Sequence, residues 1–250
     1  MLYNSCAFSK ESLDMYLKQL AKEFRKLNGK AMPAEIILIG GASILANYGF
    51  RDMTYDIDAL IIASSAMKDA VDKVGDMFEL PKGWLNSDFA KTSSYSPKLR
   101  QFSKYYRTFS NILTVRTVSA EHLIAMKLMS GRQYKHDMSD IVGIMLEHQK
   151  KGNPLSYEKI EKAVIDLYDS TDKIPEHSMQ FIKRAAVEND LEKMLSECIG
   201  QEQLAKDALI EFEEQYDNVL NDGNINDILQ TLLEIQEDEP EISDVDMTMF

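Results

Sequence analysis

The feature that most constrains the fold is a strand–turn–helix–strand unit between Ile37 and Ile62. It reads ILIGGASILANYGFRDMTYDIDALII. The apolar, isoleucine-rich run over 35–39 predicts a buried strand, and the pair of glycines that follows predicts a tight turn into a short helix over 42–49. A second strand is predicted over 54–62. The unit therefore predicts a sheet with helices packed against it.

Two acidic residues lie on the second predicted strand. Side chains alternate along a strand, so Asp56 and Asp58 share one face while Ile57 points to the other. Carboxylates about 7 Å apart along a strand can share divalent cations. The alternative is a solvated strand edge. We favour the metal site because Ile61 and Ile62 continue a buried strand, where idle acids would be costly.

The Gly40-Gly41 turn offers a seat for phosphate. Glycines at a helix start leave backbone N–H groups accessible to an anion, although a plain tight turn is the alternative interpretation. A phosphate seat beside a metal seat is what phosphoryl or nucleotidyl transfer requires. Asp244 and Asp246 have the same spacing as Asp56 and Asp58 without a glycine turn. The spacing of the two acids alone is therefore weak evidence.

The rest of the chain predicts mostly helices. Before residue 150, patterning predicts helices over 10–28, 64–78, 119–129 and 137–149, and a hairpin over 100–118. After it, patterning predicts helices over 156–168, 174–198 with a break near Asn189, 201–220 and 225–235. We expect an α+β fold: a small mixed sheet flanked by helices over 1–150, then an all-helical domain over 151–235. Residues 236–250 carry six acids and no base, and we expect them to be disordered.

Charge is distributed unevenly along the chain. Residues 1–150 have a net charge of +4 and residues 151–250 a net charge of −17. The second part would repel nucleic acid, whereas the first can approach an anion. Residues 89–120 contain no acid and interleave basic with aromatic side chains, a pattern that suits a nucleotide or an RNA strand. An ordinary hairpin with one charged face is the alternative.

Targeting and redox features are sparse. No apolar run approaches the roughly 18 residues of a membrane span, and the first residues lack a signal-peptide pattern. Cys6 and Cys198 have no metal-ligand spacing. We therefore expect reduced thiols in a cytoplasmic protein that does not contact a membrane.

Gly40, Gly41, Arg51, Thr54, Asp56 and Asp58 together resemble the signature of the DNA polymerase beta-like nucleotidyltransferase superfamily. The pattern is most similar to the bacterial branch that contains abortive-infection type nucleotidyltransferase toxins. In that branch a Lys on a later helix precedes a basic-Asp-x-x-Asp segment. This chain supplies Lys127, then Asp137 and Asp140. The resemblance covers about residues 35–145.

The resemblance implies Mg²⁺-dependent transfer of a nucleoside monophosphate from an NTP to an RNA, such as tRNA, or to a protein. It also raises a toxin role with a cognate antitoxin. Asp56 and Asp58 would bind Mg²⁺, and Lys127 would contact phosphate. Asp137 or Asp140 would orient Lys127 or act as acid or base. The residues expected around the triphosphate are Gly40, Gly41, Ser43, Arg51, Thr54 and Arg116.

One departure from the superfamily pattern keeps alternatives open. Many members carry a third carboxylate on a later strand, but the predicted strand over 112–118 has Arg116 and no acid there. Asp88 is a candidate substitute. A small-molecule acceptor such as an aminoglycoside, and a non-catalytic nucleotide-binding or interaction module, are the two alternatives. Lys127 could also be a surface-reaching helix lysine, and Asp137 a helix cap.

Overall fold

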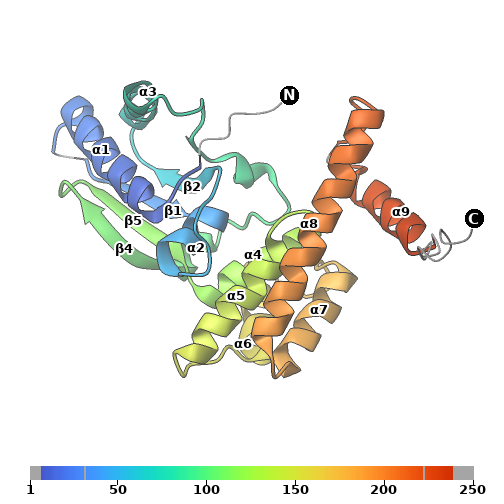
Figure 1. The fold of residues 1–250 in the computed structure, drawn as a ribbon. Coiled ribbons are helices and arrows are strands. Elements are labelled where there is room, and N and C mark those ends of the chain that lie inside the picture. Colours follow the sequence, from blue (N-terminus) through green and yellow to red (C-terminus); the bar gives the residue numbers. More distant parts are fainter. Residues whose placement is uncertain (1–6, 31, 222, 239–250) are drawn as a thin grey trace, which may run out of the picture.

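The computed structural model describes residues 7–30, 32–221 and 223–238. It contains a five-stranded mixed sheet flanked by helices, followed by a helical part (Figure 1), which confirms the predicted fold class. The strand order is β3-β2-β1-β5-β4. The strands are β1 (Ala34–Leu38), β2 (Ile57–Ile62), β3 (Leu85–Asn86), β4 (Ser103–Phe109) and β5 (Leu113–Val118).

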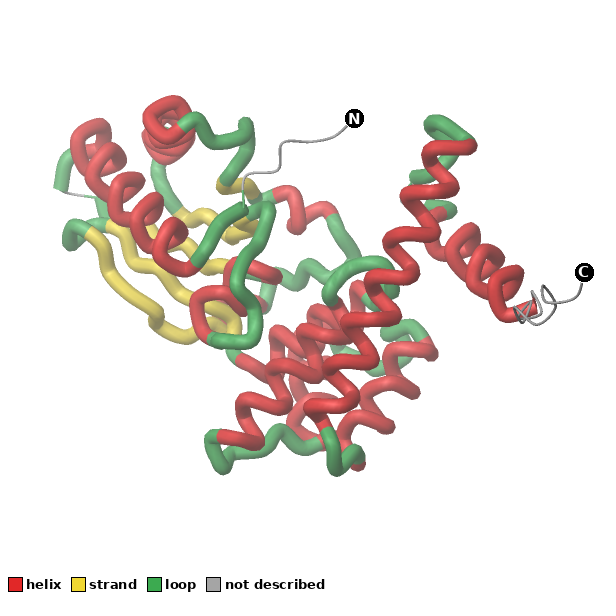
Figure 2. Tube along the Cα trace, viewed as in Figure 1, coloured by secondary structure: helices red, strands yellow, loops and turns green. Residues whose placement is uncertain are grey.

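Strand β1 lies at the centre of the sheet and gives it two apolar faces. It pairs antiparallel with β2 and parallel with β5, while β3 and β4 form the edges. Ile36 and Leu38 belong to the apolar cluster formed with α1 (Lys10–Asn28) and α3 (Ala66–Phe78). Ile37 belongs to the cluster formed with α4 (Ala120–Ser130) and the helices that follow it. The central strand is therefore buried on both sides, and Figure 2 shows the strands as one layer.

The helical part packs directly against the sheet domain. Helix α4 contacts α6 (Tyr157–Tyr168) and α7 (Glu176–Val187), and α5 (Asp137–Lys150) contacts α8 (Leu191–Gln215). The apolar cluster of these helices also contains residues of β1. The far end of α8 projects from the bundle, and α9 (Ile225–Asp238) folds back beside it (Figure 1). The division near residue 150 stays a prediction.

Several predicted boundaries were wrong. The short helix α2 covers Gly40–Asn47, and β2 begins at Ile57 because Thr54 forms only an isolated bridge with Phe8. Helix α8 runs unbroken through Gly200, although separate helices were predicted on either side of it. A helical glycine costs only about 1 kcal/mol, and buried residues before and after Gly200 keep α8 against its neighbours.

The ends of the chain test few of the remaining expectations. Helix α9 extends to Asp238, three residues into the segment predicted to be disordered, and the rest of that segment lies outside the described residues. Cys198 is a buried free cysteine, whereas Cys6 lies outside the described residues.

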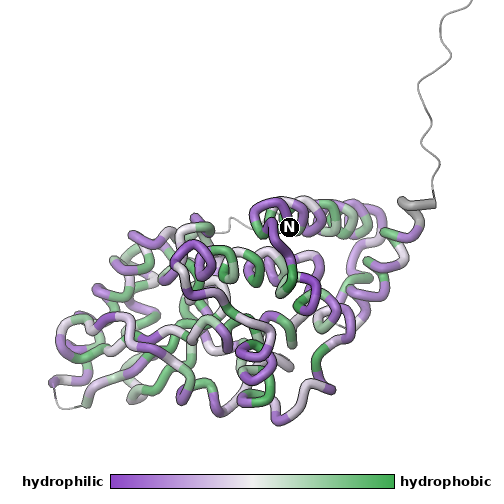
Figure 3. The backbone as a smooth tube through the Cα atoms, turned by 90° about the horizontal axis from the view of Figure 1, so that it is seen from below, coloured by the Kyte–Doolittle hydropathy of each residue, from purple (hydrophilic) through white to green (hydrophobic). Residues whose placement is uncertain are grey.

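Hydrophilic and hydrophobic residues alternate along the helices (Figure 3). Among the described helices, none combines the length and apolar character that a membrane crossing needs.

Candidate functional site

The glycine turn and the paired acids meet at one end of the central strands. Strand β1 ends at Leu38 beside the start of β2, and the Ile39 N–H donates to the Asp58 carbonyl at 2.9 Å. Ile57 is fully buried in the cluster under α1 and α3. Asp56 is exposed and Asp58 is half-buried. Asp56 directly precedes β2, so the prediction that both acids lie on the strand was wrong for Asp56. Both carboxylates are accessible, whereas Ile57 between them is buried.

The two acids act on each other electrostatically. Burial and the negative charge of Asp56 raise the pKa of Asp58 to about 6, while hydrogen bonding from Asn86 and the charge of Arg132 oppose that shift. A bound cation would relieve this repulsion. The described residues contain no group of three or more His, Cys, Asp or Glu side chains arranged to hold a metal. Mg²⁺ fits two carboxylates when phosphate and water complete its octahedron.

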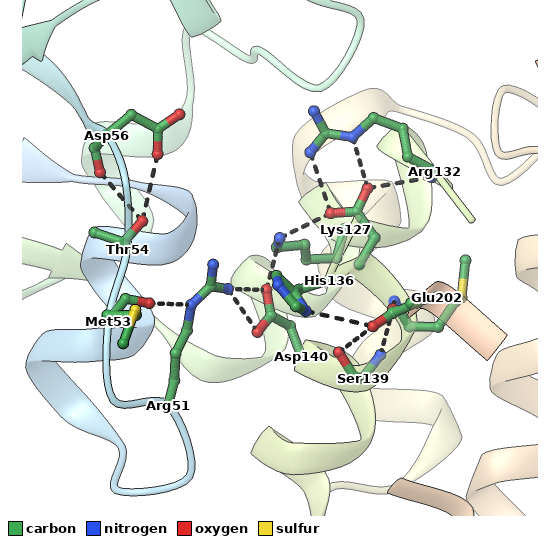
Figure 4. Close-up of polar contacts among 12 residues, drawn as sticks. Arg51, Met53, Thr54, Asp56, Lys127, Arg132, His136, Ser139, Asp140 and Glu202 are labelled. Carbon is green, nitrogen blue, oxygen red and sulfur yellow. Dashed lines mark hydrogen bonds and ion pairs between the residues drawn. The ribbon is translucent and has the colours of Figure 1, made fainter. Parts of the chain in front are cut away.

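Thr54 connects the glycine turn to the acids. Its hydroxyl donates to the Asp56 carbonyl at 3.2 Å (Figure 4). A Cβ atom on Gly41 would lie 2.5 Å from Thr54 Oγ1 and 3.3 Å from Arg51 Cζ, so glycine is required for this packing. Gly40 adopts a φ of +53° and has open space around its missing side chain. The Ser43 hydroxyl is buried without a hydrogen-bond partner.

Gly41→Ala is expected to displace Thr54 and Arg51 and thereby lower the stability of the protein. The overpacking should cost about 1–3 kcal/mol in the free energy of unfolding. Gly200→Ala is the matched control, because nothing lies within 4 Å of the added Cβ. It should be neutral or stabilising by up to about 1 kcal/mol. Urea denaturation of both variants checks this, and equal stabilities would contradict it.

A buried network of charges lies across from Asp56. Lys127 Nζ is 2.8 Å from Asp137 Oδ1 and 2.8 Å from Asp140 Oδ2. Arg132 binds Asp137 through Nε at 2.9 Å, and Arg51 binds Asp140 through Nη1 at 2.7 Å. Each buried carboxylate therefore lies between two cations. Arg51 joins the loop before β2 to α5.

Lys127 and Asp137 keep their charges at neutral pH. Burial alone would raise the pKa of Asp137, but the charges and hydrogen bonds of Lys127 and Arg132 hold that pKa well below its usual range. Burial would likewise lower the pKa of Lys127, and the charges of Asp137 and Asp140 raise it instead. A carboxylate with so low a pKa is a poor proton acceptor. The geometry suits a positioning role for Asp137.

Arg132 was not singled out from the sequence. Figure 4 places Arg132 and Lys127 on one side and Thr54 and Asp56 on the other. The Arg132 charge opposes the rise in the pKa of Asp58. Burial would lower the pKa of Arg132, but its hydrogen bond with Asp137 and the charges of Asp137 and Asp56 raise it. The available signal was its position, a basic residue between Lys127 and Asp137. The acids therefore face a positive group on the α4–α5 loop.

Glu202 on α8 is a second residue that the sequence did not indicate. Its Oε1 accepts from the N–H groups of Met138 at 3.0 Å and Ser139 at 2.9 Å, and its Oε2 accepts from Ser139 Oγ at 2.6 Å. The side chain of His136, the residue before α5, makes no capping hydrogen bond. Glu202 supplies the missing cap from 63 residues away. It fixes the helix start that bears Asp137.

Glu202→Ala is expected to destabilise the protein by about 2 kcal/mol, because two buried N–H groups and a hydroxyl lose their acceptor. Amide hydrogen exchange at Met138 and Ser139 should accelerate. Glu214→Ala is the control, since Glu214 is an exposed acid on the same helix. Unchanged exchange at the two amides in Glu202→Ala would contradict the capping role.

Side-chain contacts outside the Lys127 charge network involve Arg116, Asp88 and His136. Arg116 donates from Nε to Ser103 Oγ at 2.7 Å and from Nη2 to the Ser103 carbonyl at 2.6 Å, so it links β5 to β4. Asp88 is exposed and pairs with Lys91 at 2.7 Å, although its charge contributes to the raised pKa of Asp58. His136 is exposed, and its Nδ1 lies 3.5 Å from Glu202 Oε2.

A known family of proteins matches most of the chain. A family model described as "Nucleotidyltransferase of unknown function (DUF6036)" matches residues 15–194. Searches of the curated proteins and of the solved structures find no match. The matched region contains the glycine turn, the paired acids and the buried charge network, and it ends in α8 before Glu202.

Proposed function

The chain belongs to this family of nucleotidyltransferases of unknown function, and from that premise we propose that it transfers a nucleoside monophosphate from an NTP to an RNA or protein acceptor with Mg²⁺. The observation that carries the proposal is the juxtaposition of Asp56 and Asp58 with the Gly40-Gly41 turn. A cationic side chain, Arg132, faces the same acids. Metal ligands, a phosphate seat and a positive group thus meet at one place.

Each part of the site has a distinct role in this proposal. Asp56 and Asp58 would hold Mg²⁺, which when bound neutralises phosphate charge and supports in-line displacement at the α-phosphate. The N–H groups of Gly40 and Gly41 bind phosphate oxygens, with the unpartnered Ser43 hydroxyl as a further donor. Arg132 stabilises charge that develops on the phosphates.

The buried network positions rather than reacts. Asp137 and Asp140 hold the Lys127 ammonium in one position. In this proposal that ammonium faces the bound triphosphate. Because the pKa of Asp137 is held low, it does not take the proton of the attacking hydroxyl. We assign both acids to orienting Lys127.

The acceptor is proposed to be an RNA, with protein as the second choice. Edge strand β4 exposes Lys104 and Tyr105 to solvent. An exposed aromatic side chain and an exposed basic side chain on one strand suit the binding of an unpaired nucleotide. A toxin role with a cognate antitoxin is part of the proposal and follows from the resemblance of the motifs rather than from the geometry.

The test is label transfer. The purified chain is incubated with each α-labelled NTP, Mg²⁺ and total tRNA or cell lysate. Label on RNA supports the proposal, and label on protein supports its second choice. Label on added small molecules alone, or binding without transfer that Asp58→Ala leaves unchanged, would overturn it. Asp76→Asn, an exposed acid on α3, serves as the active control.

A further inference from the structure

An open apolar cavity lies beside the α4–α5 loop. It has a volume of about 580 Å³ and lies between this loop and helices α7, α8 and α9. Its apolar walls include Met138, Phe181, Leu204 and Leu233. Leu204 is 64% exposed, so the cavity opens to solvent as a groove. Contiguous apolar side chains that line an open groove are typical of a binding surface.

A smaller acidic cavity adjoins the apolar one. It has a volume of about 240 Å³ and shares Gln133, His177 and Leu233 with its neighbour. Asp227 and Glu234 of α9 line it. Among the described residues, neither cavity is lined by Lys or Arg. The surface therefore joins an apolar slot to a negatively charged one.

The surrounding helices extend the same chemistry. Glu197, Leu204 and Glu211 are seven residues apart and share one face of α8. No basic residue follows Lys206 in the sequence, while 14 acids do. The apolar cluster that joins α8 to α9 is small, with Ala205, Leu209 and Leu229 as its buried members. Helices α8 and α9, here called the α8–α9 arm, therefore present apolar surface with acidic residues around it.

We infer that this groove binds an amphipathic helix with a basic polar face, contributed by a partner protein. Apolar residues of such a helix, spaced by three, four and seven, would fill the apolar cavity, and its Lys or Arg side chains would meet Asp227 and Glu234. The charge of the arm repels nucleic acid. A polyhydroxylated small molecule does not match the apolar wall, because its hydroxyl groups would lose water without gaining partners.

The groove also borders the segment that carries Arg132 and Asp137. Glu202 and Met138 line it, and they form the capped start of α5 next to Asp137. Gln133 follows Arg132 in the same loop. A helix bound in the groove therefore contacts the segment that positions Arg132 and Asp137, and we expect its binding to alter nucleotide transfer. This last step rests on the proposed function, whereas binding itself does not.

Binding is measured directly by fluorescence anisotropy, so that the result is independent of activity. The probe is a labelled helical peptide of about 18 residues, with leucines on one face and lysines on the other. It should bind the full chain at least about tenfold more tightly than a peptide of the same composition whose order destroys the apolar face. Leu204→Ser should weaken binding by about tenfold or more. Glu211→Lys should also weaken it.

The matched control is Leu27→Ser, since Leu27 is 49% exposed on α1, away from the groove. It should leave binding unchanged. Equal affinity for the two peptides would overturn the inference, because attraction between opposite charges would then explain the binding. Equal affinity of Leu204→Ser and the unsubstituted chain for the helical peptide would overturn it as well. A photo-crosslinker on the leucine face should label α7, α8 or α9, and labelling confined to the sheet domain would also overturn it. Thermal melting verifies that each variant is folded.

Discussion

Asp58→Asn is expected to abolish nucleotide transfer while making the metal-free protein more stable. The folded-state pKa of Asp58 is raised from 3.8 to about 6. When the pKa of a carboxyl group is higher in the folded than in the unfolded state, the free energy of unfolding decreases as pH rises through that interval, because ionisation is less favourable in the folded state. At pH 8, asparagine removes this cost. With an allowance for solvent screening at a partly exposed site, the gain should be about 1–2 kcal/mol.

Two readouts together distinguish this prediction from a purely structural role of Asp58. In EDTA at pH 8 the melting temperature of Asp58→Asn should exceed that of the unsubstituted chain by a few degrees, roughly 2–4 °C per kcal/mol. The rate of transfer should fall by about a thousandfold or more. Asp76→Asn should change neither. A less stable Asp58→Asn, or one that retains more than about a tenth of the transfer rate, would contradict the account.

Lys127→Met should give the largest loss of stability. It leaves Asp137 and Asp140 buried with one cation each, Arg132 and Arg51. Breaking a buried ion pair by removing one partner costs about 3–5 kcal/mol. Urea denaturation measures this cost. The control is Lys193→Met, because Lys193 is a 74% exposed surface lysine whose loss should cost less than about 1 kcal/mol.

The pH dependence of the Lys127→Met effect follows from the two shifted groups. The raised pKa of Lys127 gives stability that is fully present below 10.5, its ordinary value, and is lost at higher pH. The lowered pKa of Asp137 gives stability that is present above 3.8 and is lost as pH falls below it. The cost should therefore be the same at about pH 6 and about pH 9. A cost that disappears at either pH would contradict a buried charged network.

The sequence predicts those parts of the fold that depend on local patterns. Alternation and helical periodicity are short-range signals, so the strand before the glycine turn and helices α6, α7 and α9 were predicted close to their observed bounds. Gly200 misled the prediction because a glycine signals a break, whereas packing of the flanking turns decides whether the helix continues. The two acids and the glycine turn were predictable for the same local reason.

The remainder of the site depends on contacts between distant segments. Glu202 accepts from the N–H of Ser139, 63 residues earlier, at the start of α5, and no pattern at either position signals this contact. The Arg116 side chain binds Ser103 across the hairpin, a partner that depends on strand register. The resemblance placed Lys127, Asp137 and Asp140 in one motif, but the structure was needed to show that Arg51 and Arg132 complete their charge balance.

The most direct test of the central claim is calorimetric binding of a non-hydrolysable nucleoside triphosphate with and without Mg²⁺. The unsubstituted chain is compared with the double variant Asp56→Asn/Asp58→Asn. The account predicts that Mg²⁺ tightens binding to the unsubstituted chain by about tenfold or more and has no effect on the double variant. The same affinity in both proteins, with or without Mg²⁺, would contradict it.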